Sequence, residues 1–97
     1  NAENLIPKKR DKKSTYSAIK AVTLAVDAER TWSVESIEAC LRGQCEALEW
    51  SPRDLFMPLR IILTGRKATP PLFETMEALG KARCQARLRR GMLTLRA

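Results

Sequence analysis

The sequence predicts an all-α fold, a small helical bundle, from three observations. Apolar residues recur every three or four positions along most of the chain, which is the period of a helix. Serine, threonine or proline precedes several of these stretches, and glycine follows two of them, as is typical of helix starts and ends. The chain does not alternate helical stretches with strand-like ones. We therefore expect five helical segments joined by short connections.

The first two predicted helices each begin at a serine. Ser14 is the expected N-cap of the first helix, and Ser33 that of the second. Glu35 then lies in the first turn of the second helix, where a negative charge is favourable. The apolar positions of the first helix are Tyr16, Ile19, Val22 and Val26. Those of the second are Val34, Ile37, Leu41, Cys45 and Leu48.

The third predicted helix begins at Ser51 and Pro52, residue types that favour the N-cap and the first helical position. Pro58 is expected to limit or kink this helix, because proline lacks a backbone N–H. The following run, "LRIILTG", has the composition of either a short strand or a helix, and periodicity does not decide between them. Its surroundings favour a helix that ends at Gly65 in the left-handed conformation.

The last two predicted helices follow the segment "GRKATPP". Thr69 is the expected N-cap of the fourth helix and Pro70 its first residue, and Gly80 ends it. The apolar positions of this helix are Leu72, Phe73, Met76 and Leu79. In the fifth helix, one face is formed by Cys84, Leu88, Met92 and Leu95, and a separate face by Arg83, Arg87 and Arg90.

The charge is concentrated in one half of a chain that is long enough for a single domain. We expect a basic arm or linker over residues 1–13 and one helical domain over residues 14–97. The net charge is +7, and residues 53–97 alone account for it with ten cations and three anions. An excess rich in arginine indicates phosphate recognition. The structural alternative is a solvated basic face.

Several kinds of chemistry are excluded by the composition. The chain has no histidine and three cysteines, so a Cys-His dyad, a Ser-His-Asp triad and a zinc site with histidine ligands are all impossible. We therefore predict neither catalytic nor metal-binding residues in this chain. The cysteines, and the aromatic residues Tyr16, Trp32 and Trp50, are expected in the core or at its boundary. No apolar run approaches the roughly 20 residues of a membrane-spanning helix.

The segment "PLRIILTGRKATPPLFETMEALGKARCQARL" resembles the C-terminal anticodon-binding domain of glutamyl-tRNA synthetase. The resemblance covers about residues 51–95, and residues 32–48 look similar in outline. The positions that match the family's pattern, in order, are Pro58-Leu59-Arg60, Leu63-Thr64-Gly65, Pro70 with Leu72-Phe73-Glu74, Leu79-Gly80-Lys81, and Arg87-Leu88. This resemblance implies an all-α domain of the class I aminoacyl-tRNA synthetase anticodon-binding type, in an enzyme that joins glutamate to its tRNA with ATP.

The resemblance also implies that the reaction itself is performed elsewhere. The catalytic fold of that family uses a nucleotide-binding signature that contains histidine and a Lys-Met-Ser-Lys-Ser type loop, which "DKKST" does not match. ATP and magnesium are therefore expected in a separate catalytic domain. The chain begins with Asn rather than Met, so we expect a fragment of a longer protein. The expected partners are the tRNA anticodon loop and the catalytic domain of the same parent chain, and the expected location is the cytoplasm, with no membrane association.

The residues that carry this function are implied position by position. In the family, an arginine and the Thr-Pro-x-Leu start of the next helix surround the third anticodon base, and the matching positions are Arg60, Thr69, Pro70 and Leu72. A helix N-terminus offers unpaired N–H groups, and arginine offers donors to the edge of an unstacked base. Contacts with backbone phosphates are expected from Arg66, Lys67, Lys81, Arg83 and Arg87. Without the resemblance, Arg60 would be interpreted as a surface or salt-bridged residue, and a core position would be an equally good interpretation of Leu72.

Other functions remain open from the residues alone. A basic helical module without base selectivity would bind all nucleic acids of equal charge alike. A helical domain that binds a protein through an apolar groove would keep its partner at high salt. An independent enzyme is disfavoured, because histidine is missing and no carboxylate pair lies in an apolar segment.

Overall fold

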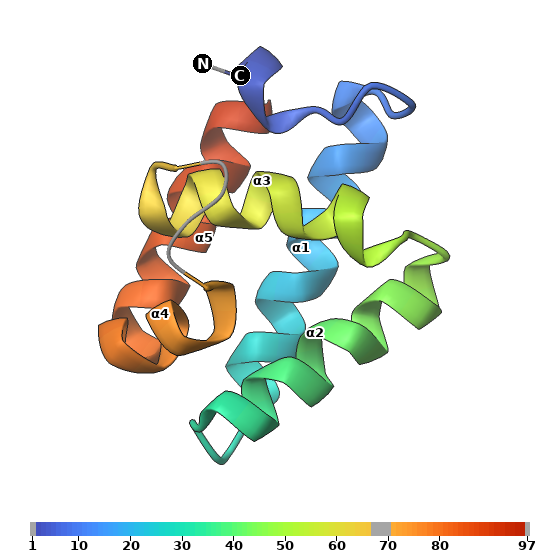
Figure 1. Cartoon of the computed structure of the whole chain (residues 1–97). Coiled ribbons are helices and arrows are strands. Elements are labelled where there is room, and N and C mark those ends of the chain that lie inside the picture. Colours follow the sequence, from blue (N-terminus) through green and yellow to red (C-terminus); the bar gives the residue numbers. More distant parts are fainter. Residues whose placement is uncertain (1, 67–70, 97) are drawn as a thin grey trace.

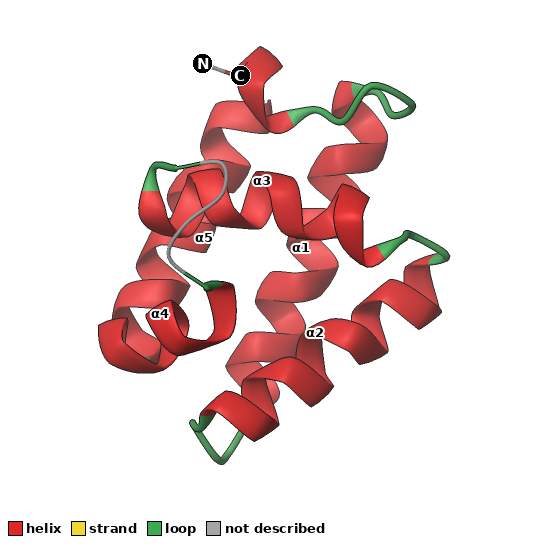
Figure 2. Ribbon diagram, viewed as in Figure 1, coloured by secondary structure: helices red, strands yellow, loops and turns green. Residues whose placement is uncertain are grey.

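The described part of the chain forms five α-helices and one turn of 3-10 helix, as Figures 1 and 2 show. The structure is a computed structural model, and it describes residues 2–66 and 71–96. The elements are η1 (Ala2–Leu5), α1 (Lys12–Ala28), α2 (Val34–Leu48), α3 (Pro52–Thr64), α4 (Leu72–Leu79) and α5 (Lys81–Arg96). The prediction of an all-α fold is confirmed, and the described residues include no strand.

The bundle is organised around α1 and α5, which make the most extensive contact between any two elements. They run antiparallel, and in Figure 1 α3 crosses in front of them. Helices α2 and α4 pack on each other at the other end of the bundle from η1. The radius of gyration is 12.0 Å, close to the roughly 12.5 Å expected for a compact domain of this length. All the helices therefore share a single core.

Helices α1, α2, α4 and α5 contribute residues of their predicted apolar stripes to this core, and α3 adds a stripe that was not predicted. The outermost positions of the stripes, such as Tyr16 and Met92, are only partly buried. Trp50 is buried and Trp32 is partly buried against the core, as expected for both. The fully buried stripe residues are Ile19, Val22 and Val26 of α1, Ile37 and Leu41 of α2, Leu55, Leu59 and Leu63 of α3, Leu72 and Met76 of α4, and Cys84, Leu88 and Leu95 of α5.

Two helix starts and one helix end follow the predicted local chemistry. The Ser33 hydroxyl accepts a hydrogen bond from the backbone N–H of Ser36, whose own hydroxyl accepts one from Ser33, so the two residues cap α2 reciprocally. Ser51 caps α3 by accepting from the N–H of Asp54 at 3.1 Å. Gly65 ends α3 with a φ of 76°, a conformation that glycine adopts without strain.

The predicted start of α1 is wrong, and that of α4 falls on residues that the structure does not describe. Helix α1 begins three residues earlier than expected from Ser14, because Asp11 is its N-cap and Ser14 occupies the third helical position. The Asp11 carboxylate accepts from the N–H of Ser14 at 2.7 Å, and the Ser14 hydroxyl accepts from the N–H of Asp11 at 3.2 Å. Helix α4 begins at Leu72 with Pro71 before it. The expected start at Thr69 and Pro70 lies outside the described residues.

Helix α3 continues through Pro58, so this proline does not limit the helix, and the alternative, a kink, stays a prediction. Proline cannot donate the backbone hydrogen bond that the carbonyl four residues earlier would accept. The apolar face compensates, since Leu55, Leu59 and Leu63 are each 0% exposed. Burial of three leucines, at about 1.5–3 kcal/mol each, is large enough to offset a lost backbone hydrogen bond of about 1 kcal/mol.

Within residues 1–13, predicted as a basic arm or linker, η1 packs against the bundle, and Lys12 and Lys13 are part of α1. Leu5 of η1 is 5% exposed, and η1 contacts α1, α3 and α5. The Arg10 guanidinium lies over the Trp50 ring, 4.2 Å from its centroid, and donates to the carbonyl of Glu49 at 3.4 Å. Arg10 therefore holds this segment to the connection between α2 and α3.

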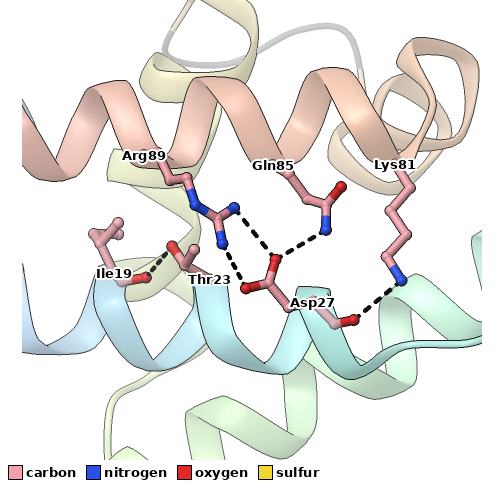
Figure 3. Close-up of polar contacts among 6 residues, drawn as sticks. All are labelled: Ile19, Thr23, Asp27, Lys81, Gln85 and Arg89. Carbon is pink, nitrogen blue, oxygen red and sulfur yellow. Dashed lines mark hydrogen bonds and ion pairs between the residues drawn. The ribbon is translucent and has the colours of Figure 1, made fainter.

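Polar side chains fasten α5 to the last turn of α1, as Figure 3 shows. The Asp27 carboxylate accepts hydrogen bonds from Arg89 at 2.7 Å and from Gln85 at 2.9 Å. These hydrogen bonds, from Arg89 first and Gln85 second, lower the pKa of Asp27. The Lys81 ammonium donates to the backbone carbonyls of Asp27 at 3.2 Å and Glu29 at 2.5 Å. The register between the two helices is thus set by side chains spaced one turn apart on α5.

Asp27→Asn should destabilise the chain in a pH-dependent way. Because the pKa of Asp27 is lowered in the folded state, its carboxylate stabilises the fold above the unfolded-state pKa of about 3.9. That contribution is lost as the pH falls through the lower folded-state pKa. The side chains of Asp27 and Arg89 are 29% and 54% exposed, so we expect the melting temperature of the variant to be only a few degrees lower near neutral pH. Thermal melts by circular dichroism should show this difference shrinking below about pH 4. A difference that is the same near neutral pH and in strong acid would contradict an ionic origin.

Candidate nucleic-acid interface

The predicted base-binding residues that the structure describes lie on α3 and at the start of α4. Arg60 is half-buried, one turn before the end of α3. Its Nε atom is buried without a partner, and its side chain makes no hydrogen bond or ion pair with the described residues. The guanidinium donors of Arg60 are therefore not used by the part of the fold that the structure describes.

Leu72, the other described residue of this set, is 2% exposed and belongs to the core. Its side chain packs inside the bundle at the first position of α4. Leu72 is therefore a core residue, and its contact with a base stays a prediction. Thr69, Pro70 and the predicted phosphate contact Lys67 lie outside the described residues.

Thr64 and Gly65 shape the end of α3 beside Arg60. The Thr64 hydroxyl donates to the carbonyl of Arg60 at 2.6 Å and accepts from the backbone N–H of Arg66 at 3.0 Å. The chain leaves the helix through the left-handed Gly65. Arg66 is exposed directly after this turn, and its guanidinium makes no hydrogen bond with the described residues. Its predicted contact with phosphate therefore requires no rearrangement of the described residues.

Two other predicted phosphate contacts have structural hydrogen bonds. Arg87 Nη1 donates to the carbonyl of Leu63 at 2.6 Å, at the C-terminal end of α3. Lys81 donates to carbonyls at the C-terminal end of α1, as described above. The last carbonyls of a helix lack intrahelical donors and carry partial negative charge, so cations stabilise them. Arginine has five N–H donors, which leaves Arg87 able to bind phosphate as well.

Helix α5 carries six of the eighteen cations of the chain and a net charge of +6, against +7 for the whole chain. It holds no anion. Arg83, Arg90 and Arg96 are exposed, whereas Lys81 and Arg87 are half-buried, and Arg89 is paired with Asp27. The predicted cationic face of this helix is thus divided. Part of it binds the neighbouring helices, and part of it faces solvent.

An aromatic cluster that sequence reasoning missed joins three helices near Arg60. Phe56 of α3 and Phe73 of α4 meet edge to face, with ring centroids 5.5 Å apart. The Arg42 guanidinium lies 5.9 and 5.8 Å from the two ring centroids, and Glu38 pairs with it at 2.8 Å. The Glu38–Arg42 pair is visible in the sequence as an i,i+4 spacing. Its contact with residues 56 and 73 depends on the tertiary fold.

The cysteines and acidic residues show no arrangement for metal binding. Burial raises the pKa of the Cys84 thiol to about 11, so this thiol stays protonated at neutral pH. Burial also raises the pKa values of Cys40 and Cys45. Over residues 2–66 and 71–96, no three cysteine, aspartate or glutamate side chains come together in a group that could hold a metal ion. In the same residues, no helix combines the length and the apolar character needed to cross a membrane.

The fold and the candidate interface together define a small all-α domain whose last helix has a net charge of +6. Residues 2–92 match the family described as "Anticodon binding domain", and the chain belongs to this family. This confirms the resemblance seen in the sequence.

Relatives of the chain are much longer than the chain itself. It is 38% identical over 88 residues to a glutamate–tRNA ligase of Chloroflexus aurantiacus, which covers 91% of this chain and 18% of the relative. It is 41% identical over 93 residues to that of Roseiflexus castenholzii, covering 96% of the chain and 18% of the relative. With the ligase of Leifsonia xyli subsp. xyli, the identity is 49% over 73 residues, 74% of the chain and 14% of the relative. The chain therefore spans less than a fifth of these proteins.

Arg87→Ala should lower the free energy of unfolding by about 1–2 kcal/mol, because the substitution removes a charged donor from the Leu63 carbonyl. Arg66→Ala is the matched control, since it removes the same charge just beyond the end of α3 without breaking a hydrogen bond of the described fold. We expect it to change the free energy of unfolding by less than about 0.5 kcal/mol. Urea unfolding followed by circular dichroism measures both. Equal destabilisation by the two substitutions would show that Arg87 has no special structural role.

Proposed function

We propose that this chain is the anticodon-binding part of a glutamate–tRNA ligase. In this role it binds the anticodon loop of tRNA(Glu) and positions the tRNA for ATP-dependent aminoacylation by a catalytic domain of the same parent protein. The observation that carries the proposal is the match to two proteins named glutamate–tRNA ligase. The two matches cover 91% and 96% of the chain, at 38% and 41% identity. The family match over residues 2–92 supports the assignment of anticodon binding.

Arg60 is the described residue best suited to base recognition in this proposal. Its side chain has no acceptor among the described residues, and it lies one turn before the end of α3. Anticodon bases are unstacked, so their hydrogen-bonding edges are open to donors such as a guanidinium. Thr69, Pro70 and Leu72 complete the proposed base site, as the resemblance implies.

The backbone phosphates would be bound by cations at the end of α3 and along α5. Arg66 and Arg83 are exposed and make no hydrogen bond or ion pair with the described residues, so they are the strongest described candidates. Lys67, Lys81 and Arg87 complete the proposed set. Phosphate contacts add affinity and salt dependence without selecting a base.

The chemical step belongs to the rest of the parent enzyme in this proposal. ATP and magnesium would be bound by its catalytic domain, since the described residues bring together no group of metal ligands. This chain would supply binding and orientation of the tRNA only. The parent enzyme is proposed to be cytoplasmic.

A second function is favoured by one observation, the six cations and absent anions of α5. Such a helix can bind any nucleic acid through its phosphates. The chain would then be a basic helical module without base selectivity. Binding to RNAs that differ in one base separates the two functions.

Arg60→Ala should weaken binding to the anticodon stem-loop of glutamate tRNA by about 1–3 kcal/mol and relax selection at one base. The measurement compares this stem-loop with one in which only the third anticodon base is changed, across a salt series. The matched control is Arg53→Ala, because Arg53 is exposed in the first turn of the same helix. We expect the control to bind both stem-loops slightly more weakly than the wild-type chain does, and by the same factor.

The outcomes of this experiment are distinct. A wild-type preference for the natural base that survives moderate salt supports base recognition, and its loss in Arg60→Ala assigns it to Arg60. Equal, steeply salt-dependent binding of both stem-loops favours the non-selective module. A wild-type chain that binds neither stem-loop contradicts both functions.

A further inference from the structure

A groove of about 400 Å³ lies between the end of α3, α5 and η1. Pockets that hold small organic groups have volumes of about 300–1,000 Å³, so the groove has room for one nucleotide-sized group. Among the described residues that line the groove, none belongs to the predicted base site, and Arg87 is the one predicted phosphate contact. Figure 1 shows α3 crossing α5 here, close to η1.

The floor of the groove is aliphatic and is shaped by a glycine. Ile61 and Ile62 of α3 line it and are half-buried, and Leu5 of η1 closes one side. Gly91 of α5 is buried opposite Ile62. A Cβ atom at position 91 would lie 2.7 Å from Cδ1 and 2.9 Å from Cγ1 of Ile62, which is too close. Glycine therefore lets α3 and α5 approach and presents a flat apolar surface between them.

The rim of the groove is polar and cationic. Arg87 and Arg90 line it from α5, together with Thr94, and Asn4 lines it from η1. Arg87 is held against the Leu63 carbonyl, whereas the Arg90 side chain is exposed and makes no hydrogen bond or ion pair with the described residues. No acidic residue is among the described residues that line the groove. A ligand with an apolar face and a negative group suits this combination.

The groove also adjoins the proposed base site. Thr64 lines the groove and lies one helical turn after Arg60, about 6 Å along the axis of α3. The hydrogen bond from the Thr64 hydroxyl to the carbonyl of Arg60 joins the two positions. Neighbouring nucleotides of one strand can therefore reach both places.

We propose that this groove binds a second, neighbouring nucleotide of the same single-stranded RNA. Its phosphate is bound by Arg90, and its base lies against Ile61 and Ile62. Nucleobases have apolar faces and a charged backbone, which the aliphatic floor and cationic rim complement. The inference rests on the proposed function, and it adds a nucleotide site that lies outside the third-base site.

Arg90→Gln tests the phosphate contact, with Arg53→Gln as the matched control. Both substitutions remove one exposed charge, and Arg53 is about 16 Å from Thr64 along α3. The probe is the anticodon stem-loop of glutamate tRNA. We expect Arg90→Gln to weaken binding about fivefold or more and to reduce the slope of log affinity against log salt by about 0.7. Arg53→Gln should weaken binding less than about twofold.

Thr94→Glu tests the groove from a second direction, because it places a negative charge on the rim. Thr94→Gln is its control of matched size. We expect the glutamate variant to bind at least about fivefold more weakly than the glutamine variant. In the wild-type chain, methyl NMR signals of Ile61 and Ile62 should shift when the stem-loop is added. Thermal melts establish that each variant is folded.

The results separate this proposal from the proposed function. If the wild-type chain selects the third base but Arg90→Gln binds like Arg53→Gln, the groove proposal is overturned and the proposed function stands. If the isoleucine signals do not shift on binding, the proposed contact of the base with Ile61 and Ile62 is overturned. If the wild-type chain binds neither stem-loop, the proposed function itself fails.

Discussion

The packing of α5 against its neighbours depends on hydrogen bonds from its basic side chains to the C-terminal ends of other helices. Lys81 binds the end of α1 and Arg87 the end of α3. Carbonyls at a helix end have no partner within the helix, and they attract positive charge. Arg89 adds an ion pair with Asp27 in the last turns of α1. Three of the six cations of α5 thus bind neighbouring helices and, with the core, position them.

The proposed RNA contacts depend on the same hydrogen bonds. Because Arg87 holds the end of α3 against α5, it also fixes the position of Thr64 and Gly65, and hence of Arg66 after them. Gly91 sets how closely the two helices approach. The proposed RNA-binding end of α3 is therefore held in place by the core on one side and by Arg87 on the other. The remaining cations of α5, which are Arg83, Arg90 and Arg96, are exposed to solvent.

Features that depend on local hydrogen bonds were readable from the sequence, and those that depend on tertiary contacts were not. The caps at Ser33 and Ser51 and the left-handed Gly65 involve only residues within a turn of each other. The start of α1 was misplaced because Asp11 and Ser14 are both good caps, and their reciprocal bonds favour the earlier one. Pro58 is expected to limit or kink α3, and burial of the leucines sustains the helix through it.

The candidate site shows the same division. The charge of α5 was evident from the sequence, but Lys81 and Arg87 could not be recognised as caps of α1 and α3, which are 52 and 24 residues away in the chain. Arg42 was missed for the same reason, since its contacts lie on two other helices.

The distribution of charge between α2 and α5 gives the bundle an electric dipole. Helix α2 carries Glu35, Glu38 and Glu46 against the single cation Arg42, whereas α5 is wholly cationic. The two helices lie on different sides of the bundle in Figure 1. A polyanion is attracted toward α5 and repelled by the acidic face of α2. Attraction of this kind raises the rate of productive encounters more than the lifetime of the complex.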